Sequence, residues 1–319
     1  MGVTGTMACI LADWGTTNLR VWAVRPDQTM EGPRTSQMGL LGVEGGRFAE
    51  ALAEACGDWL AGPKSVPVVM CGMVGSKLGW KEVPYLPTPL ALGDLGRHLS
   101  AIETPFAGTV AIVPGVVMDD ETQPEVMRGE ESQILGAMQA LGIREDAFLL
   151  PGTHSKWALI DNGNLVSFRT YMTGEVFGLI RRSGTLSQLM DGDARDDAAF
   201  HRGVLFARST DAGNLLHALF SVRALGLLGR ISREGLASYL SGLLIGAELS
   251  DGMAWLRAQG VPGLAAAIGT PAMLDAYRLA ALPYGLRIVA LDSAAILPQA
   301  LLSIAATAGM VTGCAEDKT

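Results

Sequence analysis

The sequence predicts an α/β protein of two domains that face each other, and three observations carry this prediction. The chain has 319 residues, which is longer than one ordinary domain of about 100–200 residues. Hydrophobic residues make up 49% of the chain and charged residues only 18%, so it can bury a core and is not disordered throughout. Its two halves then repeat one order of elements: a strand, a glycine-threonine loop, a second strand, and helices that alternate with strands.

The strands expected in the first half are short apolar runs, most of them bounded by glycine or proline. They are Ala8–Ala12, Asn18–Val24, Val66–Cys71 and Thr109–Val113. Apolar residues at helical spacing predict helices over Arg47–Leu60 and Val126–Leu141. A loop-rich stretch with several prolines, Gly72–Gly108, separates the last two strands.

The second half begins with a strand at Ala147–Leu150 and a hairpin around the turn Asp161–Asn164, a strong turn signal. The hairpin strands are expected at Lys156–Ile160 and Leu165–Arg169. The helices that follow are expected at Thr173–Arg182, Asp196–Arg208, Asn214–Leu225, Arg233–Leu249, Pro271–Leu282 and Ser293–Thr307. Two more strands are expected between the last three helices, at Leu264–Ile268 and Arg287–Ala290.

The domain boundary is expected near the helix that ends at Leu141. We therefore expect an N-terminal domain over residues 1–132, with a substrate-side insertion at about 72–108. The C-terminal domain would cover residues 133–319, with a helical insertion at about 183–250. Residue-level repeats are not visible, so the two halves share an architecture only.

Charge and hydropathy exclude several classes of protein. The formal net charge is −8, and no basic run or basic-aromatic stripe stands out, so a nucleic-acid partner is not expected. The most apolar stretches, Leu236–Leu249 and Ala294–Met310, are interrupted by polar residues or proline. They predict buried helices and no membrane span. The spare apolar helices of the second half leave a homodimer open.

Cysteine usage and the start of the chain predict a cytoplasmic protein. Cys9, Cys56, Cys71 and Cys314 form no C-x-x-C pair and no metal-ligand spacing, so reduced thiols are expected. The segment before Met7 lacks the basic and apolar regions of a signal peptide. We expect the six residues before Met7 to be either an extended start or not native.

Glycine is the unusual residue, since 40 are present where average usage would give roughly 22. Two glycine-threonine loops, Asp13–Asn18 and Gly152–Ser155, each follow the first strand of a half. Backbone N–H groups and threonine hydroxyls in such turns suit phosphate oxygens. Either loop alone is equally well explained as a hairpin turn, but the pair indicates a nucleotide held from two domains. Walker-type and dinucleotide-binding glycine patterns are absent from the sequence.

These loops resemble those of the superfamily of sugar kinases, actin and heat-shock ATPases. The resemblance is closer to the 2-keto-3-deoxygalactonate kinases and covers nearly the whole chain. It is carried by Asp13–Arg20, Gly72–Leu86, Val126–Gln133, Leu150–Trp157, Phe168–Glu175 and Ser241–Glu248. The resemblance implies an actin-like ATPase fold: two ribonuclease-H-like domains facing each other across a nucleotide-binding cleft. It also implies ATP and Mg²⁺ as cofactors.

The resemblance further assigns roles to the loop residues. Phosphate contacts would come from Gly15, Thr16, Thr17, Asn18, Gly152, Thr153 and His154. His154 either donates to a phosphate or is a hydrogen-bonded loop histidine. Asp13 would hold Mg²⁺ directly or through water, with a turn-forming aspartate as the alternative. Gly269 and Thr270 would contact the adenosine, although Pro271 after them also fits a plain helix start.

An acid after a glycine precedes the second phosphate loop in glycerol-type kinases, and Gly129–Glu130 matches that position. Glu130 is therefore expected to be catalytic, orienting and deprotonating the substrate hydroxyl from a helix N-terminus. Glu131 is its rival, and a helix-starting acid without a catalytic role is the third alternative. The family carries Glu where glycerol-type kinases carry Asp, so the reach of the residue differs.

Cations and polar groups around the proline-rich insertion would bind a sugar acid. The candidates are Lys77, Trp80, Lys81, Arg128, Arg169 and Glu175. Arginine suits bidentate recognition of a carboxylate, but each cation fits a plain surface charge equally well. Trp80 either packs on the sugar carbons or fills a small core, and Glu175 either contacts substrate or caps a helix.

The expected activity is ATP-dependent phosphorylation of the terminal hydroxyl of 2-keto-3-deoxy-D-galactonate, with closure of the two domains on the substrate. The fold and the kinase class rest on both the loops and the resemblance, whereas the sugar acid rests on the resemblance alone. A kinase for another keto-deoxy sugar acid or a polyol is the first alternative. An actin- or chaperone-like ATPase with a protein partner is the second, and the lack of a separate peptide-binding domain argues against it.

Overall fold

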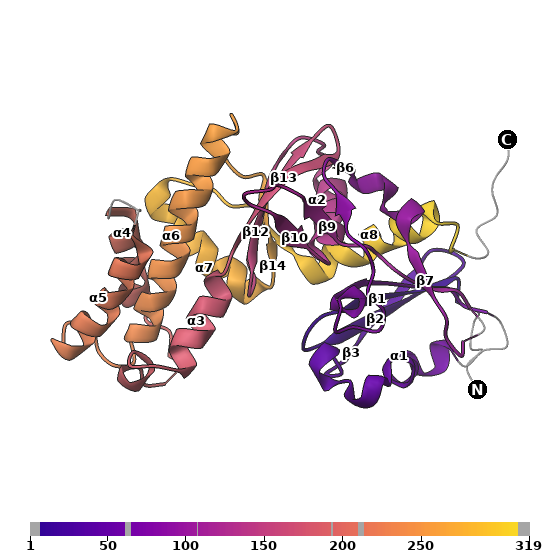
Figure 1. Cartoon of the computed structure of the whole chain (residues 1–319), viewed down its shortest axis with the longest axis horizontal. Coiled ribbons are helices and arrows are strands. Elements are labelled where there is room, and N and C mark those ends of the chain that lie inside the picture. Colours follow the sequence, from indigo (N-terminus) through magenta and orange to yellow (C-terminus); the bar gives the residue numbers. More distant parts are fainter. Residues whose placement is uncertain (1–6, 61–64, 107, 193, 210–213, 312–319) are drawn as a thin grey trace. The chain divides into compact units, whose positions relative to one another are not determined.

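The computed structural model of the chain describes residues 7–60, 65–106, 108–192, 194–209 and 214–311. The chain forms two compact units (Figure 1). Unit 1 runs to Arg144 and also contains Asp161–Ser167 and the chain from Ala294 onward. Unit 2 contains Glu145–Ile160 and Phe168–Ser293. Each unit is built around its own β-strands and its own apolar core.

Unit 1 is organised by a six-stranded sheet in the order β3-β2-β1-β4-β8-β7. The strands are β1 (Cys9–Trp14), β2 (Leu19–Val24), β3 (Met30–Ser36), β4 (Val68–Gly72), β7 (Ser100–Ile102) and β8 (Val110–Ile112). β1 runs antiparallel to β2 and parallel to β4, with Asp13 opposite Cys71 and Trp14 opposite Gly72. The carboxyl ends of β1 and β4 therefore meet at one edge of the sheet.

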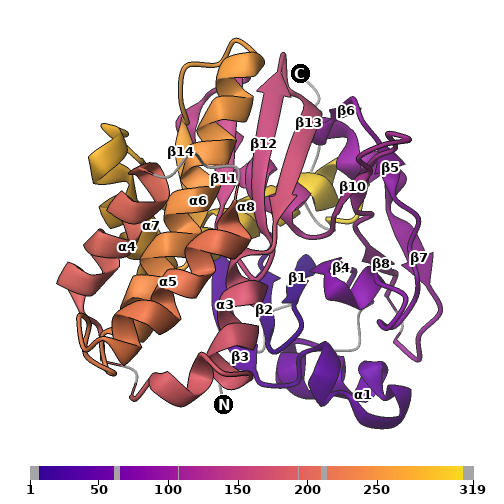
Figure 2. The ribbon, with the colours of Figure 1, turned by 60° about the vertical axis from the view of Figure 1, so that its left-hand side comes forward.

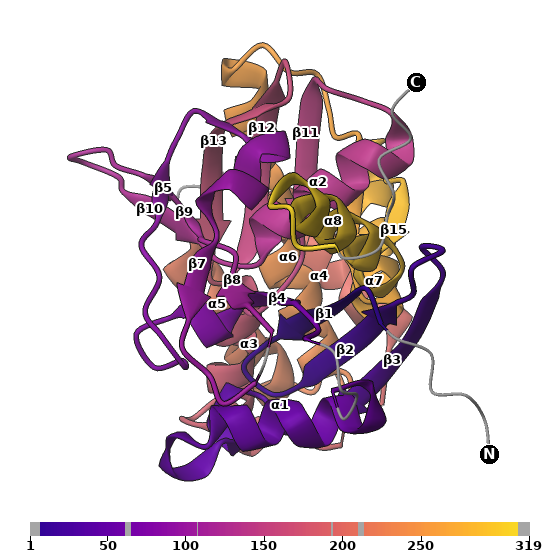
Figure 3. The ribbon, with the colours of Figure 1, turned by 90° about the vertical axis from the view of Figure 1, so that its right-hand side faces the viewer.

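Helices cover both faces of this sheet (Figure 3). Helix α1 (Phe48–Cys56) lies on one face, where Phe48 and Leu52 join the core formed by alternate residues of β1 and β2. Helices α2 (Glu130–Leu141) and α8 (Ser293–Thr307) lie on the other face. They touch closely, because a Cβ on Gly136 would lie 2.8 Å from the Ile296 carbonyl oxygen.

Short elements complete unit 1. β5 (Leu86–Pro87), β9 (Val116–Met118) and β10 (Glu125–Met127) form a second sheet in the order β10-β9-β5. The 3₁₀ segments of unit 1 are η1 (Leu40–Gly42), η2 (Glu44–Gly46), η3 (Gly57–Trp59), η4 (Met73–Gly75) and η5 (Leu92–His98). Strand β6 (Leu90–Ala91) pairs with Asn164 and Leu165, which explains why the tip of that hairpin belongs to unit 1.

Unit 2 contains strands in the order β15-β14-β11-β12-β13. Their bounds are β11 (Asp146–Leu150), β12 (Ser155–Asp161), β13 (Asn164–Tyr171), β14 (Ala266–Gly269) and β15 (Ala290–Asp292). β11 is antiparallel to β12 and parallel to β14. This arrangement matches that of β1, β2 and β4 in unit 1, so the predicted repeat of architecture is present in the two central sheets.

The helices of unit 2 are α3 (Thr173–Arg182), α4 (Asp197–Ser209), α5 (Leu215–Leu227), α6 (Leu236–Ala258) and α7 (Pro271–Ala281). Two 3₁₀ segments, η6 (Ser187–Leu189) and η7 (Leu282–Tyr284), accompany them. Figure 2 shows α4 and α5 beside α6. One apolar cluster joins α6 and α7 to the sheet, and another joins α4, α5 and α6. The backbones of α4 and α6 nearly touch at Gly242, where a Cβ would lie 2.0 Å from the Phe200 carbonyl oxygen.

The structure corrects several expected elements. The helix expected from Val126 starts at Glu130, because Gly129 has a φ of +104° and the preceding residues pair with β9 as strand β10. Strand β3 was not expected, since its Gly32-Pro33 pair resembles a loop. The two units also differ from the expected ranges 1–132 and 133–319, because α2 and α8 pack on each other within unit 1.

Cysteine state and helix composition agree with the sequence. Cys9, Cys56 and Cys71 are free and buried, whereas Cys314 lies outside the described residues. Among the helices in the described part of the chain, none combines the length and hydropathy needed to cross a bilayer. The expected helical insertion at about 183–250 contains α4, α5 and most of α6.

The contact between α4 and α6 can be tested with Gly242→Ala. Alanine favours a helix over glycine by up to about 1 kcal/mol, but its methyl group would overlap the Phe200 carbonyl. We expect a net loss of about 1–3 kcal/mol in the free energy of unfolding, measured by urea denaturation. The matched control is Gly178→Ala in α3, whose methyl group would meet only the flexible Arg182 side chain at 3.4 Å. It should leave stability unchanged or raised; equal effects at both positions would contradict the close contact.

Candidate active site

Asp13 lies at the carboxyl end of β1, where its carboxylate is partly buried. The Arg20 guanidinium donates to Oδ2 from Nη2 at 2.5 Å and from Nε at 3.2 Å. The Asp13 side chain is 14% exposed, and the Cys71 thiol lies 3.9 Å from its other oxygen, Oδ1. One carboxylate oxygen is thus held by a cation, while the other faces the edge where β1 and β4 end.

The turn after Asp13 presents its donors outward. The Gly15 N–H donates to the Asn18 carbonyl at 2.9 Å, which closes the turn. N–H groups of the segment 39–41 donate to the carbonyls of Gly15, Thr16 and Thr17 at 3.0–3.3 Å. Thr16 and Thr17 are exposed, and within the described residues their own N–H groups have no hydrogen-bond partner. The turn therefore uses its carbonyls internally and offers N–H and hydroxyl groups to a ligand.

Backbone contact brings distant segments to this edge. Gly72, at the end of β4, has a φ of +92°, and a Cβ there would lie 2.8 Å from the Trp14 carbonyl oxygen. A Cβ on Gly129 would lie 3.2 Å from the Gly72 Cα. The start of α2, which carries Glu130, is therefore held against the end of β4, next to the end of β1 that carries Asp13.

Glu130 and Glu131 have different surroundings at this helix start. Glu131 is fully buried; its carboxylate accepts the Gly129 N–H at 2.6 Å and the Ser132 hydroxyl at 3.0 Å. Burial, with a further contribution from Glu130, raises the pKa of Glu131 to about 7. Glu130 is half-buried, and its carboxylate accepts the Arg128 N–H at 2.9 Å. Only Glu130 retains exposure to a substrate.

Cys71 lies between these acids and stays a thiol. Burial raises its pKa well above the ordinary value, and the charges of Asp13 and Glu131 raise it further. A protonated, buried thiol is a poor nucleophile. Cys71 therefore fills space between Asp13 and Glu131 without entering the chemistry.

The insertion candidates of unit 1 are dispersed. Lys77 is exposed, and the Lys81 ammonium donates to the Ala101 carbonyl at 2.9 Å. Trp80 stacks on Phe48 with ring centres 6.0 Å apart and meets Trp14 edge-on at 6.2 Å. Trp80 therefore packs on the apolar core of unit 1, as in the alternative in which it fills a small core. Its contact with Trp14 supports the end of β1, which carries Asp13.

Arg128 is the least exposed of the three cationic candidates in unit 1. It donates to the Val83 carbonyl at 2.7 Å and lies 4.3 Å from the Tyr85 ring centre. Its Nε and Nη1 atoms are buried without a hydrogen-bond partner. These two nitrogens could each donate to a ligand oxygen, but Nη1 packs against Gly75, so the side chain must move before a ligand reaches it.

In unit 2, the loop after β11 carries the second glycine-threonine motif. Thr153 and His154 are exposed, and the Gly152 N–H donates to the Ser155 hydroxyl at 3.4 Å. His154 Nε2 lies 2.5 Å from a carboxylate oxygen of Glu175. The structure therefore joins two predicted residues, one from the phosphate set and one from the substrate set, in a single pair.

Helix α3 begins directly against this loop. The Glu175 N–H donates to the Thr153 carbonyl at 2.9 Å, and a Cβ on Gly174 would lie 2.4 Å from the Gly152 carbonyl oxygen. The positive end of the α3 dipole consequently points at the loop, which favours an anion there.

A cavity of about 270 Å³ adjoins the loop and is mostly apolar. It is lined by Gly152, by Thr173, Gly174 and Phe177 of α3, by Ser241, Leu244 and Ile245 of α6, and by Ala272, Met273, Ala276 and Tyr277 of α7. Gly269 and Thr270 lie at the end of β14 and at the start of α7, so they hold the helix whose next residues form one wall. A planar apolar group with a phosphate tail fits this combination.

Arg169 is placed differently from the other candidates. It lies on β13 in unit 2, where it pairs with Asp251 of α6 at 3.3 Å and lies 5.6 Å from the Trp255 ring centre. The Tyr171 hydroxyl donates to the same Asp251 carboxylate at 2.6 Å. This surface cluster satisfies the guanidinium within unit 2.

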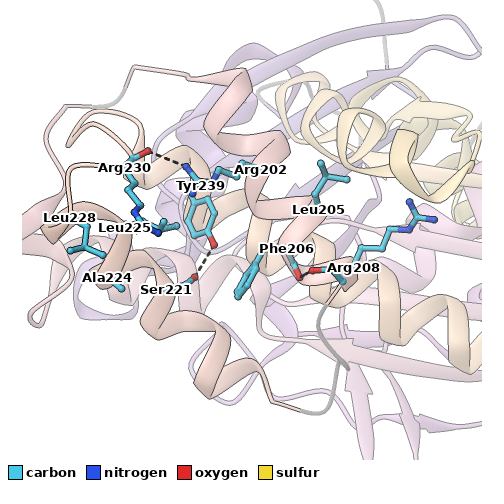
Figure 4. Close-up of a pocket in the computed structure, with 11 residues that line it drawn as sticks. Arg202, Leu205, Phe206, Arg208, Ser221, Ala224, Leu225, Leu228, Arg230 and Tyr239 are labelled. Carbon is cyan, nitrogen blue, oxygen red and sulfur yellow. Dashed lines mark hydrogen bonds between the residues drawn. The ribbon is translucent and has the colours of Figure 1, made fainter.

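A second cavity, of about 770 Å³, is lined by none of the predicted residues. It lies between α4, α5 and α6, and Figure 4 shows Tyr239 bonded to Ser221 and Arg202 bonded to Arg230 in it. Leu216, Phe220 and Leu227 of the adjacent α5 are more than half exposed. Nothing covers these side chains among the described residues, and the homodimer that the sequence left open stays a prediction.

Several residues of the site were missed from the sequence. Gly39 supports the first turn, since a Cβ there would lie 2.2 Å from the Thr17 carbonyl carbon. Phe177 and Met273 line the cavity beside the second loop. Their signal is spatial: nothing in the sequence near residue 39 indicates that it folds against residue 17.

Comparison with known proteins gives consistent matches. The family model described as 2-keto-3-deoxy-galactonokinase matches residues 13–304. A 2-dehydro-3-deoxygalactonokinase of Escherichia coli (strain K12) is 38% identical over 77% of this chain and 80% of its own. A crystal structure from Sinorhizobium meliloti, provisionally named for the same activity, has a TM-score of 0.85 at 33% identity and covers 93% of this chain and 98% of its own.

A more distant structure supports the predicted fold class. The activator of 2-hydroxyisocaproyl-CoA dehydratase from Clostridium difficile, with bound ADPNP, has a TM-score of 0.50 at 12% identity, covering 94% of this chain and 96% of its own. At that identity the likeness shows the fold alone, and it agrees with the actin-like α/β fold expected from the sequence.

The raised pKa of Glu131 makes stability depend on pH. Folding raises this pKa from an ordinary value of 4.5 to about 7, so between these values the folded state holds a proton that the unfolded state releases. Stability from this group therefore falls as pH rises. Relative to Glu131→Gln, the wild type should lose about 2–3 kcal/mol in the free energy of unfolding between about pH 5 and about pH 8.

Urea denaturation at a series of pH values measures this difference. Glu130→Gln is the control: it should keep most of the slope, because burial contributes more to the shift than Glu130 does. Parallel stability profiles for the wild type and Glu131→Gln would contradict the assignment.

Proposed function

We propose how individual residues of this chain carry out phosphoryl transfer, starting from its membership of the 2-keto-3-deoxy-galactonokinase family. Membership of this family makes the chain a sugar-acid kinase that uses ATP. The substrate is 2-keto-3-deoxy-D-galactonate, and the reaction serves galactonate catabolism. The phosphoryl group goes to the terminal 6-hydroxyl, which leaves the carboxylate end of the sugar acid for recognition.

The proposed phosphoryl transfer requires one general base, which accepts the proton of the substrate hydroxyl. The oxygen of the 6-hydroxyl attacks the γ-phosphorus of ATP, and the bond from that phosphorus to the β-phosphate oxygen breaks, which releases ADP. The hydroxyl proton passes to the Glu130 carboxylate. Glu130 rather than Glu131 takes this role, because Glu131 is buried and occupied by the Gly129 N–H and the Ser132 hydroxyl.

The observation that carries the proposal is the turn at Gly15–Asn18. Its carbonyls are capped by residues 39–41, and its Thr16 and Thr17 groups are exposed. In unit 2, Gly152, Thr153 and His154 would contact phosphate from the loop beside the apolar cavity. That cavity would take the adenosine, with Gly269 and Thr270 holding α7 at its edge.

Asp13 is the residue proposed to hold Mg²⁺. Within the described residues no group of three or more acidic, histidine or cysteine side chains gathers for a metal, so a dedicated protein cage is not built. Magnesium in phosphoryl-transfer sites takes one or two carboxylates and completes its shell with phosphate and water, and one Asp13 oxygen fits that pattern. When bound, the ion would neutralise charge on the phosphates.

Lys77, Lys81 and Arg128 are proposed for the sugar acid on unit 1, with Arg128 favoured because two of its nitrogens lack partners. Trp80 and Glu175 are also proposed to contact the sugar acid, although each has the structural alternative described above. Arg169 is the weakest candidate for the sugar acid, because it pairs with Asp251.

The free thiols of Cys9, Cys56 and Cys71 agree with a reducing compartment, and we assign the enzyme to the cytoplasm.

Product analysis tests the proposed substrate. The enzyme is incubated with ATP, Mg²⁺ and a panel of keto-deoxy sugar acids and polyols, and the products are identified by mass spectrometry. We expect one phosphoryl group on the terminal hydroxyl of 2-keto-3-deoxy-D-galactonate, with the highest kcat/KM of the panel. Absence of preference for this acid would overturn the proposed substrate and leave the kinase class intact.

The base is tested with Glu130→Gln, which keeps the shape and removes the proton acceptor. We expect kcat to fall by about 10²-fold or more, with nucleotide affinity unchanged, measured by a coupled assay of ADP release. Asp13→Asn should raise the Mg²⁺ concentration needed for half-maximal activity, which Glu130→Gln should not. Near-normal turnover of Glu130→Gln would rule out the proposed base.

A further inference from the structure

Glu248 is a buried carboxylate that the proposed reaction does not use. It lies on α6, at the end of the stretch Ser241–Glu248 that carries part of the family resemblance, and it is 3% exposed. A buried carboxylate costs free energy of folding unless donors surround it. The position of those donors indicates what the residue does.

Each donor to Glu248 comes from a different element of unit 2. The indole N–H of Trp157, on β12, donates to Oε1 at 2.9 Å. The Tyr277 hydroxyl, on α7, donates to Oε2 at 2.7 Å, and the hydroxyl of Thr173, the first residue of α3, donates to the same oxygen. One carboxylate therefore ties together the start of α3, the middle of α7 and the strand after the glycine-threonine loop.

A further hydrogen bond extends this network into the loop. Ser155 and Tyr277 have their hydroxyl oxygens 3.0 Å apart. The Tyr277 hydroxyl has one hydrogen, which it donates to Glu248, so Ser155 is the donor to Tyr277. The Ser155 oxygen in turn accepts the Gly152 N–H at 3.4 Å. A chain of hydrogen bonds thus connects Glu248 on α6, through the hydroxyls of Tyr277 and Ser155, to the N–H of Gly152.

The same elements form the walls of the cavity beside the loop. Gly152, Thr173 and Tyr277 are among its lining residues, whereas Glu248 is not. Ile245 lines the cavity one turn before Glu248 on α6. Glu248 consequently lies behind the wall, where it bonds to residues of the wall without facing a bound ligand.

We propose that Glu248 is a positioning residue of the nucleotide site, which fixes the Gly152 loop, the start of α3 and α7 against one another and so sets the affinity for adenine nucleotides. This inference rests on the proposed function, because it takes the cavity as the nucleotide site. Loss of the network should weaken nucleotide binding far more than recognition of the sugar acid, because the cations favoured for that acid, Lys77, Lys81 and Arg128, lie in unit 1.

The test uses Tyr277→Phe and Glu248→Gln in the full chain. Calorimetric titration with ADP measures nucleotide affinity, and steady-state kinetics give separate KM values for ATP and the sugar acid. We expect both variants to weaken ADP binding about tenfold and to raise the KM for ATP similarly, with the KM for the sugar acid changed less than about twofold. If Glu248→Gln does not fold, Tyr277→Phe decides alone.

Tyr284→Phe is the matched control. The Tyr284 hydroxyl also bonds to α6, at the Gly246 carbonyl and the Ser250 hydroxyl, but it does not reach the loop. It should leave ADP affinity at the wild-type value. Equal weakening in Tyr284→Phe, or unchanged ADP affinity in folded Tyr277→Phe, would overturn this inference alone. A wild type that binds no ADP would instead overturn the proposed function.

Discussion

In each unit, a helix start is held close to a strand end or loop by direct contact between backbones at glycine. In unit 1, Gly72 meets the Trp14 carbonyl, and Gly129 meets Gly72 in turn. In unit 2, Gly174 meets the Gly152 carbonyl. A side chain at any of these positions would push a helix start away from a strand end. Because the helix starts carry Glu130 and Glu175, the missing Cβ atoms are what bring acidic side chains to the two glycine-threonine loops.

An acidic chain must hold anions without help from its overall field, since the formal net charge is −8. Local hydrogen bonds reduce the number of negative groups that face outward at each loop. Carbonyls of the first turn are bonded to residues 39–41, so they do not repel phosphate. The buried acids near the loops, Glu131 and Glu248, are turned inward and surrounded by N–H or hydroxyl donors. What remains outward at each loop is mainly donor groups.

The sequence predicted the central strands and most helices because those elements repeat apolar residues locally, as in Ala8–Ala12 and Thr173–Arg182. It did not predict β10 or the pairing of α2 with α8, because these depend on contacts between residues far apart in the chain. The candidate site likewise has parts that could be predicted from the sequence and parts that could not. The loops follow from their composition, whereas the support from Gly39 and the cavity wall at Phe177 exist only in the folded chain.

The choice between Glu130 and Glu131 shows what structure adds to a motif. Consecutive helical residues point about 100° apart, so two adjacent acids at one helix start cannot share an environment. Burial raises the pKa of Glu131 to about 7, and its oxygens are used by Gly129 and Ser132. Glu131 thereby holds the Gly129 turn in place. That leaves Glu130 on the open side of the turn, where a carboxylate can accept a proton from a substrate hydroxyl.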